Sequence, residues 1–240
     1  MQHVIIPRSI ENTFPFLKKQ YLNSTTQLFY ILGTFISFVG ICHLSRIFFP
    51  EPYSIRFFTI SHQGDPYSNP QGCWIFNTGV FLMGLLVIPY IVYLWKKFVV
   101  FLPKMAIITG VIHVLATLNV SLVGIFPMHF YPFHRIVAFL AFTCYLLSIN
   151  LYLGMIIVRF SSLFFQTVHR ILFGSYLVFP NLIYGILLLT WNNGKIKIAF
   201  RSHVIVLNFP LWEWLYFYCI FGSLILISFF FYRHADQISK

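Results

Sequence analysis

Six stretches of about 20 residues with almost no charged side chains constrain the fold more than any other feature of this sequence. Roughly 20 residues of α-helix, rising 1.5 Å each, cross the ~30 Å hydrocarbon core of a bilayer. Strands of a membrane β-barrel span about 10 residues and alternate in polarity, so they do not fit this pattern. We therefore predict six transmembrane helices, at about Gln27–Phe49, Trp74–Trp95, Met105–Phe126, Arg135–Val158, Ile171–Thr190 and Leu211–Tyr232.

The composition supports the same conclusion. Only 9% of the 240 residues are charged, whereas a soluble domain has about 25%. So few charges cannot cover a surface that faces water. The connections between the apolar stretches are short and leave no room for a soluble domain. We expect an all-α polytopic membrane protein: a six-helix transmembrane bundle with short loops at 27–232, preceded by a cytoplasmic segment at 1–26 and followed by a cytoplasmic tail at 233–240.

The positive charge points to lipid rather than to nucleic acid. The chain has a formal net charge of +11, but its basic residues lie between the apolar stretches, where anionic lipid headgroups are the nearest partners. Ten Lys and Arg residues fall on the side that holds both termini and six on the other side. The positive-inside rule then predicts a multi-pass protein with both termini in the cytoplasm. The expected partners are membrane lipids, with other membrane proteins as a second class and nucleic acid excluded.

Motifs for a metal or a cofactor are absent from the sequence. The four cysteines are scattered singly, without a C-x-x-C pair, which argues against a zinc or thioredoxin-like site. A disulfide between Cys42 and Cys73 is left open, because both lie near one membrane face. The chain also lacks a G-x-S-x-G elbow, an H-E-x-x-H pair and a P-loop. We expect no metal and no cofactor, and ordinary hydrolase or nucleotide-driven chemistry has no motif to support it.

Scarce polar residues gather at one predicted face. His62 and Asp65 lie in the first outward connection, His134 follows the second, and Glu213 opens the last apolar stretch. If the protein is an enzyme, these four are the catalytic candidates, with a histidine as base and a carboxyl group to orient or protonate it. The simpler interpretation of Asp65 is a local capping contact. A carboxylate near lipid needs a partner, so we expect Glu213 to contact His62, His134 or Arg135, either directly or through one water.

A lipid headgroup is the predicted occupant of the resulting polar pocket. Arg135 is the candidate contact for its phosphate, although a long basic side chain at a helix end also snorkels to headgroups. His43, Asn77 and Asn119 lie in outer halves of apolar stretches and are expected to point inward. Tryptophans at this face suit an interfacial aromatic belt as well. The predicted lipid-binding residues are Arg135, His129, Asn77, Asn119, Trp212 and Trp214.

Several short motifs resemble a known superfamily. They are "ISHQG" and "NP" before the second apolar stretch, "FNTGVFLMGLL" within it, "LVGIFP" with a following histidine, and "WEW" at the start of the last one. Together, over Thr34 to Phe230, they resemble the FRAG/DRAM/SFK superfamily of six-span membrane proteins, nearest to its prokaryotic-type relatives of unknown function. The resemblance implies roles such as remodelling of GPI-anchor lipids, lysosomal and autophagy regulation or phosphoinositide-related signalling. It supplies no catalytic motif to carry over.

Three functions remain in competition at this point. The first is binding or remodelling of a phospholipid or glycolipid at the outer leaflet. The second is a non-catalytic regulator or scaffold that binds partner membrane proteins. A small transporter or channel ranks third, because such proteins usually show inverted repeats or charges at the membrane midplane.

Overall fold

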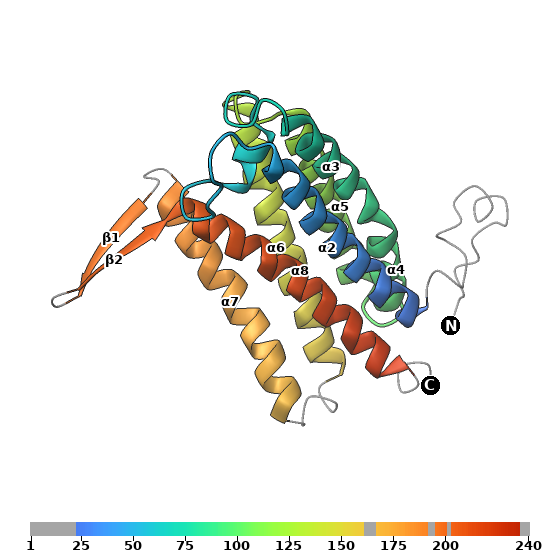
Figure 1. Ribbon diagram of the computed structural model, residues 1–240. Helices are drawn as coiled ribbons and strands as arrows, with labels where there is room; N and C mark the ends of the chain where they lie inside the picture. The colour runs from blue at the N-terminus through green and yellow to red at the C-terminus, as the bar shows by residue number, and fades with distance from the viewer. Residues whose placement is uncertain (1–22, 161–166, 192–194, 201–202, 236–240) are drawn as a thin grey trace, which may run out of the picture.

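Six helices that are long and apolar enough to cross a membrane dominate the structure (Figure 1). The computed structural model describes residues 23–160, 167–191, 195–200 and 203–235. Each predicted apolar stretch coincides with one span, so the prediction of an all-α, multi-pass integral membrane protein is confirmed. The helices are α2 (Ser24–Ile47), α3 (Cys73–Leu86), α4 (Ile88–Val99), α5 (Pro103–Ile125), α6 (Phe133–Arg159), α7 (Thr167–Trp191) and α8 (Phe209–Arg233).

Local sequence explains where several helices begin. The Asn23 side chain caps α2 by accepting a 2.8 Å hydrogen bond from the Thr25 N–H. Proline occupies the first turn of α4, α5 and α8, where its missing N–H has no helical partner to lose. Pro89 accordingly divides the second span into α3 and α4 at Val87, whereas Pro180 lies inside an uninterrupted α7.

Small residues bring α3 and α5 into close contact. A methyl group added at Gly124 would lie 2.8 Å from the backbone nitrogen of Phe81, and one at Gly84 would overlap Ser121. Hydroxyl groups of α5 also donate to carbonyl oxygens of α3, including Ser121 to Phe81 at 3.0 Å. Such small side chains let helix backbones approach where lipid provides no hydrophobic driving force.

A two-stranded hairpin joins α7 to α8 and projects from the bundle (Figure 1). Its strands are β1 (Lys195–Phe200) and β2 (His203–Asn208), paired antiparallel with Lys195 opposite Asn208. The hairpin lies in a segment that the sequence analysis treated only as a connection between two apolar stretches. The alternating pattern "KIKIAF" followed by "HVIVLN" is the signal that indicates a hairpin.

The start of α2 and the end of α8 lie at the same end of the bundle (Figure 1). We call the opposite end, where α2 ends and α8 begins, the loop end. This arrangement follows from six crossings. The prediction that the loop end faces away from the cytoplasm stays a prediction.

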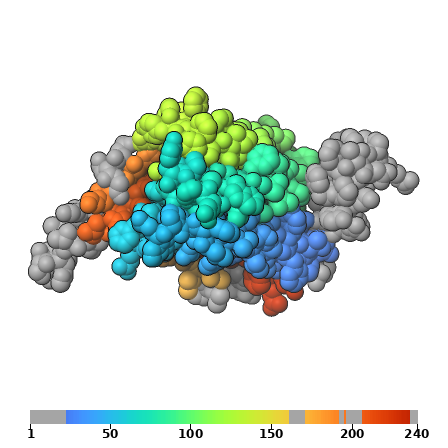
Figure 2. Space-filling model, turned by 45° about the horizontal axis from the view of Figure 1, so that its top comes forward, coloured from blue at the N-terminus to red at the C-terminus, as the bar shows by residue number. Residues whose placement is uncertain are grey.

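The segment from 48 to 72 folds down onto the loop end. It contains a short 3-10 helix, η3 (Ile60–Gly64), and Figure 2 shows its atoms packed beside those of the connection between α5 and α6. Buried Asn69 ties it in place by donating to the carbonyl oxygens of Ser45 and Gln63, at 3.1 and 3.0 Å. An added methyl group at Gly72 would collide with the Ser45 carbonyl, so this approach requires glycine.

Candidate functional site

An open pocket of about 550 Å³ lies at the loop end, where η3, α6 and the start of α8 meet. Its volume falls within the 300–1,000 Å³ usual for small-molecule sites. Four of the predicted site residues line it: His62, His134, Arg135 and Glu213. Ser61, which the sequence analysis did not single out, lies between them.

Glu213 connects α8 to η3. Its side chain is buried, and its Oε2 accepts a 2.8 Å hydrogen bond from the Ile60 N–H, while Oε1 lies 3.4 Å from Ser61 Oγ. The Trp214 indole N–H makes a second connection by donating to the Phe58 carbonyl at 3.2 Å. None of the three expected partners bonds directly to Glu213: its hydrogen bonds go to η3, and Ser61 links it to His134, while a contact through one water stays a prediction.

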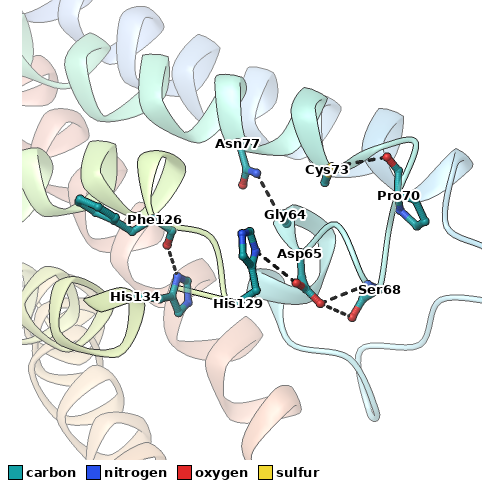
Figure 3. A network of polar contacts seen from close by, with 9 residues as sticks. All are labelled: Gly64, Asp65, Ser68, Pro70, Cys73, Asn77, Phe126, His129 and His134. Atoms are coloured by element: carbon teal, nitrogen blue, oxygen red, sulfur yellow. Dashed lines mark hydrogen bonds and ion pairs between the residues drawn. The ribbon is translucent and has the colours of Figure 1, made fainter. Parts of the chain in front are cut away.

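His134 is held by one ring nitrogen and faces Ser61 with the other. Nδ1 lies 2.7 Å from the carbonyl oxygen of Phe126, at the end of α5 (Figure 3). A carbonyl oxygen only accepts, so Nδ1 carries the proton and Nε2 of the neutral ring is an acceptor. Ser61 Oγ lies 3.1 Å from that Nε2, and its single proton is shared between this nitrogen and Oε1 of Glu213 as the two available acceptors. The Ser61 hydroxyl, the His134 ring and the Phe126 carbonyl oxygen thus form a chain of neighbouring polar groups.

His62 has a different arrangement. Its Nδ1 accepts a 3.1 Å hydrogen bond from the Thr59 N–H, and Thr59 Oγ1 accepts from the His62 N–H at 3.3 Å, which together cap η3. Burial lowers the pKa of His62, and the nearby Asp65 charge offsets part of that effect. The ring is therefore neutral at pH 7 and carries its proton on Nε2.

Asp65 organises the loop beside the pocket. Its Oδ2 accepts hydrogen bonds from the Ser68 N–H and hydroxyl at 3.1 and 2.7 Å, and Oδ1 lies 3.6 Å from Nδ1 of His129 (Figure 3). The local capping interpretation of Asp65 is confirmed. An Asp65–His62 acid–base couple is not formed, because the ring bond of His62 goes to Thr59.

Of the predicted lipid-binding residues, Arg135 lines the pocket and the others lie outside its lining. The Arg135 guanidinium is 5.7 Å from the centre of the Trp191 ring, and its Nη1 donates to the Tyr131 hydroxyl at 3.2 Å. Asn77 supports η3 instead, donating to the Gly64 carbonyl at 2.8 Å (Figure 3). The remaining residues outside the lining are His129, Asn119, Trp212 and Trp214.

A smaller, mostly apolar cavity of about 70 Å³ lies deeper in the bundle. Its walls come from apolar side chains of several helices, among them Phe38 and Met83. Ser61, Ala138 and Glu213 line both this cavity and the open pocket. The polar pocket therefore adjoins the apolar interior at these three residues.

A groove of about 400 Å³ follows the outside of α6 and α7. Arg135 and Trp191 line both the groove and the pocket, and the rest of the groove is lined by apolar residues such as Phe139 and Leu188. Lower down, α6 and α7 are joined by the reciprocal amide pair Asn150–Asn181. The pocket thus borders a surface that faces lipid.

The prediction that His43 points into the bundle is wrong. His43 is exposed rather than directed into the bundle. His113 is fully buried in α5, but its ring nitrogens have no hydrogen-bond partner, and its ring packs edge-on against Tyr145 and Tyr152. Cys42 and Cys73 are free thiols. Within the described residues, no group of three or more His, Cys, Asp or Glu side chains is arranged to hold a metal.

No known protein family, curated protein or solved structure matches this chain. The site must therefore be interpreted from its own geometry. Ser61 was missed because a lone serine beside a histidine in sequence is common, and its partner His134 is distant in the chain. The "ISHQG" motif was the available signal, since it places a serine within the polar segment.

Proposed function

We propose that this protein binds a phospholipid or glycolipid, with the headgroup in the pocket at the loop end and the start of an acyl chain in the adjoining apolar cavity. One observation carries the proposal: the pocket and the cavity share the lining residues Ser61, Ala138 and Glu213. A ligand that fits both must be polar at one end and apolar at the other. In a membrane protein, lipids are the abundant molecules of that kind.

The charges of the pocket suit a headgroup. Arg135 offers a planar set of N–H donors, which match the oxygens of a phosphate group. Glu213 and the rings of His62 and His134 add hydrogen-bonding groups for hydroxyl or ammonium groups. On the predicted topology, the lipid comes from the outer leaflet. The groove between α6 and α7 offers it a route that stays within the bilayer.

Lipid retention by the purified protein tests this proposal. Lipids should be extracted from protein purified in mild detergent and identified by mass spectrometry, alongside native mass spectrometry of the intact complex. Arg135→Ala should reduce retention about 10- to 100-fold, because a hydrogen bond to a charged group contributes ~1.5–3 kcal/mol. Arg159→Ala is the matched control, since Arg159 also stacks on an aromatic ring but lies at the other end of α6.

A second variant addresses the junction between pocket and cavity. Ala138→Leu places additional bulk where the two meet and should reduce retention while Arg159→Ala does not. Equal retention by the wild type and both pocket variants would show that the lipid is only a surface layer. Absence of any retained lipid would favour the alternative, a non-catalytic regulator or scaffold for membrane proteins.

The leaflet is a separate question with its own test. Reporter fusions after Lys240 and within the β1–β2 hairpin should report opposite faces of the membrane, with the fusion after Lys240 in the cytoplasm. The reverse result would move the proposed site to the cytoplasmic leaflet without changing its chemistry.

A further inference from the structure

Ser61 lies at the boundary between the polar pocket and the apolar cavity. Ser61 is half-buried and lines both the polar pocket and the apolar cavity. In a glycerolipid, the polar head and the apolar chain are joined by an ester bond. A lipid held as proposed above therefore places its ester group beside the Ser61 hydroxyl.

We infer that Ser61 and His134 form a nucleophile–base pair that cleaves an acyl ester of a glycerolipid bound in the pocket. The inference rests on the proposed lipid-binding function. Its geometric support is the 3.1 Å contact between Ser61 Oγ and His134 Nε2, with the opposite ring nitrogen held 2.7 Å from the Phe126 carbonyl. A nucleophile, a base within hydrogen-bond reach and a group that orients the base are the features by which such pairs are recognised.

The reaction proceeds in two balanced halves. Ser61 Oγ attacks the ester carbonyl carbon, and its proton passes to Nε2 of His134. The bond from that carbon to the glycerol oxygen then breaks, and the leaving oxygen takes the proton from His134, which releases a lysolipid and leaves an acyl group on Ser61. Water gives a proton to His134, attacks the acyl group and releases a fatty acid, while the proton returns to Ser61.

Two neighbouring groups assist this chemistry. Glu213 Oε1 lies 3.4 Å from Ser61 Oγ and helps to hold the hydroxyl group in place beside His134. Glu213 also fixes the backbone before Ser61 through its 2.8 Å bond with the Ile60 N–H. His62 lines the same pocket with a protonated Nε2, a neutral donor for the negative charge that develops on the carbonyl oxygen.

The missing G-x-S-x-G elbow does not conflict with this inference. That motif belongs to one fold, whereas serine–histidine pairs recur on unrelated folds with different sequence orders. Ser61 comes from η3 and His134 from the first turn of α6, so the pair is formed only when segment 48–72 folds onto the bundle. The competing interpretation is a purely structural hydrogen bond between these two elements.

A reactive probe separates these two interpretations. Protein in detergent or nanodiscs is treated with a fluorophosphonate, which modifies activated serines, and the adduct is located by peptide mass spectrometry. We expect labelling at Ser61, none at that position in Ser61→Ala, and unchanged labelling in the control Ser54→Ala, whose serine lies outside the pocket lining. His134→Gln should slow labelling at least 100-fold, since a positioned base contributes about 10²–10⁴. Wild-type protein that gives a normal thermal transition but no label at Ser61 would refute the inference.

Release of fatty acid tests the substrate. Wild-type protein in vesicles of phosphatidylcholine and phosphatidylglycerol should release fatty acid and lysolipid in equal amounts, and both products should be lost in Ser61→Ala. Retained lipid without labelling or release overturns the ester cleavage and leaves lipid binding intact. Labelling of Ser61 with neither retention nor release overturns the glycerolipid substrate together with the proposed function.

Discussion

Asn69 should contribute more to stability than its small size suggests. It is fully buried, and its amide donates to the carbonyl of Ser45, the hydroxyl of Ser45 and the carbonyl of Gln63, at 3.0–3.1 Å. Its oxygen accepts from the Gly72 N–H at 3.1 Å. Asn69→Ala removes these bonds and strands the Gly72 donor. The two amide protons make at most two full hydrogen bonds, worth about 1 kcal/mol each, and the stranded buried donor adds ~1–3 kcal/mol, so the loss is about 4 kcal/mol.

The expected readout is a lower midpoint of thermal unfolding in detergent. A loss of about 4 kcal/mol corresponds to roughly 8–16 °C for a chain of this size. Asn69→Asp should be at least as severe, because a carboxylate has no donor for the two facing carbonyl oxygens. Asn119→Ala is the control, since Asn119 bonds only to the Leu115 carbonyl of its own helix. If both alanine variants melt at the same temperature, the buried network does not hold the segment in place.

Three further predictions concern stability. Glu213→Ala leaves the Ile60 N–H without an acceptor and should lower the free energy of unfolding by ~1–3 kcal/mol. Glu213→Gln keeps an acceptor and should lower it by under about 1 kcal/mol in the same melting assay. Equal losses of stability in the two variants would contradict the hydrogen bond between Glu213 and Ile60. Gly124→Ala should destabilise the protein by ~1–3 kcal/mol through overpacking. Gly154→Ala should not, because an added methyl group there meets no atom within 4 Å. Matching melting curves of the two variants would contradict the close α3–α5 contact. Burial lowers the pKa of His62 in the folded protein, so its contribution to stability is complete above about pH 6.5 and is lost as pH falls through this lowered pKa. His62→Gln should therefore make the melting temperature depend less on pH between pH 7.5 and 5.5. An unchanged pH dependence would exclude His62 as the cause.

Hydrophobicity was sufficient to locate the helices, because a bilayer requires long apolar segments and leaves few alternatives. The same physics explains the interhelical pair Asn150–Asn181, because polar side chains within a span hydrogen-bond across helices. It was less reliable for isolated polar residues. His43 is exposed although it lies in an apolar stretch, and His113 is buried among aromatic rings without a hydrogen bond.

The site depended on information that a single sequence lacks. Four candidates line the pocket because topology alone brings their segments to one end of the bundle. The partners of Glu213 were missed because they include a backbone amide, which carries no mark in the sequence. Ser61 acquires its significance only from His134, which comes from a segment distant in the chain. The superfamily resemblance and the orientation in the membrane stay predictions.

Arg135 and Trp191 line both the pocket and the groove on the outside of α6 and α7, so the pocket borders the lipid phase. A ligand that arrives along α6 and α7 diffuses in two dimensions and never dissolves in water. Its occupancy then depends on its mole fraction among neighbouring lipids, and an aqueous dissociation constant has no meaning for it. Diluting the membrane with an inert lipid should therefore empty the pocket, whereas diluting the vesicles with buffer should leave it filled.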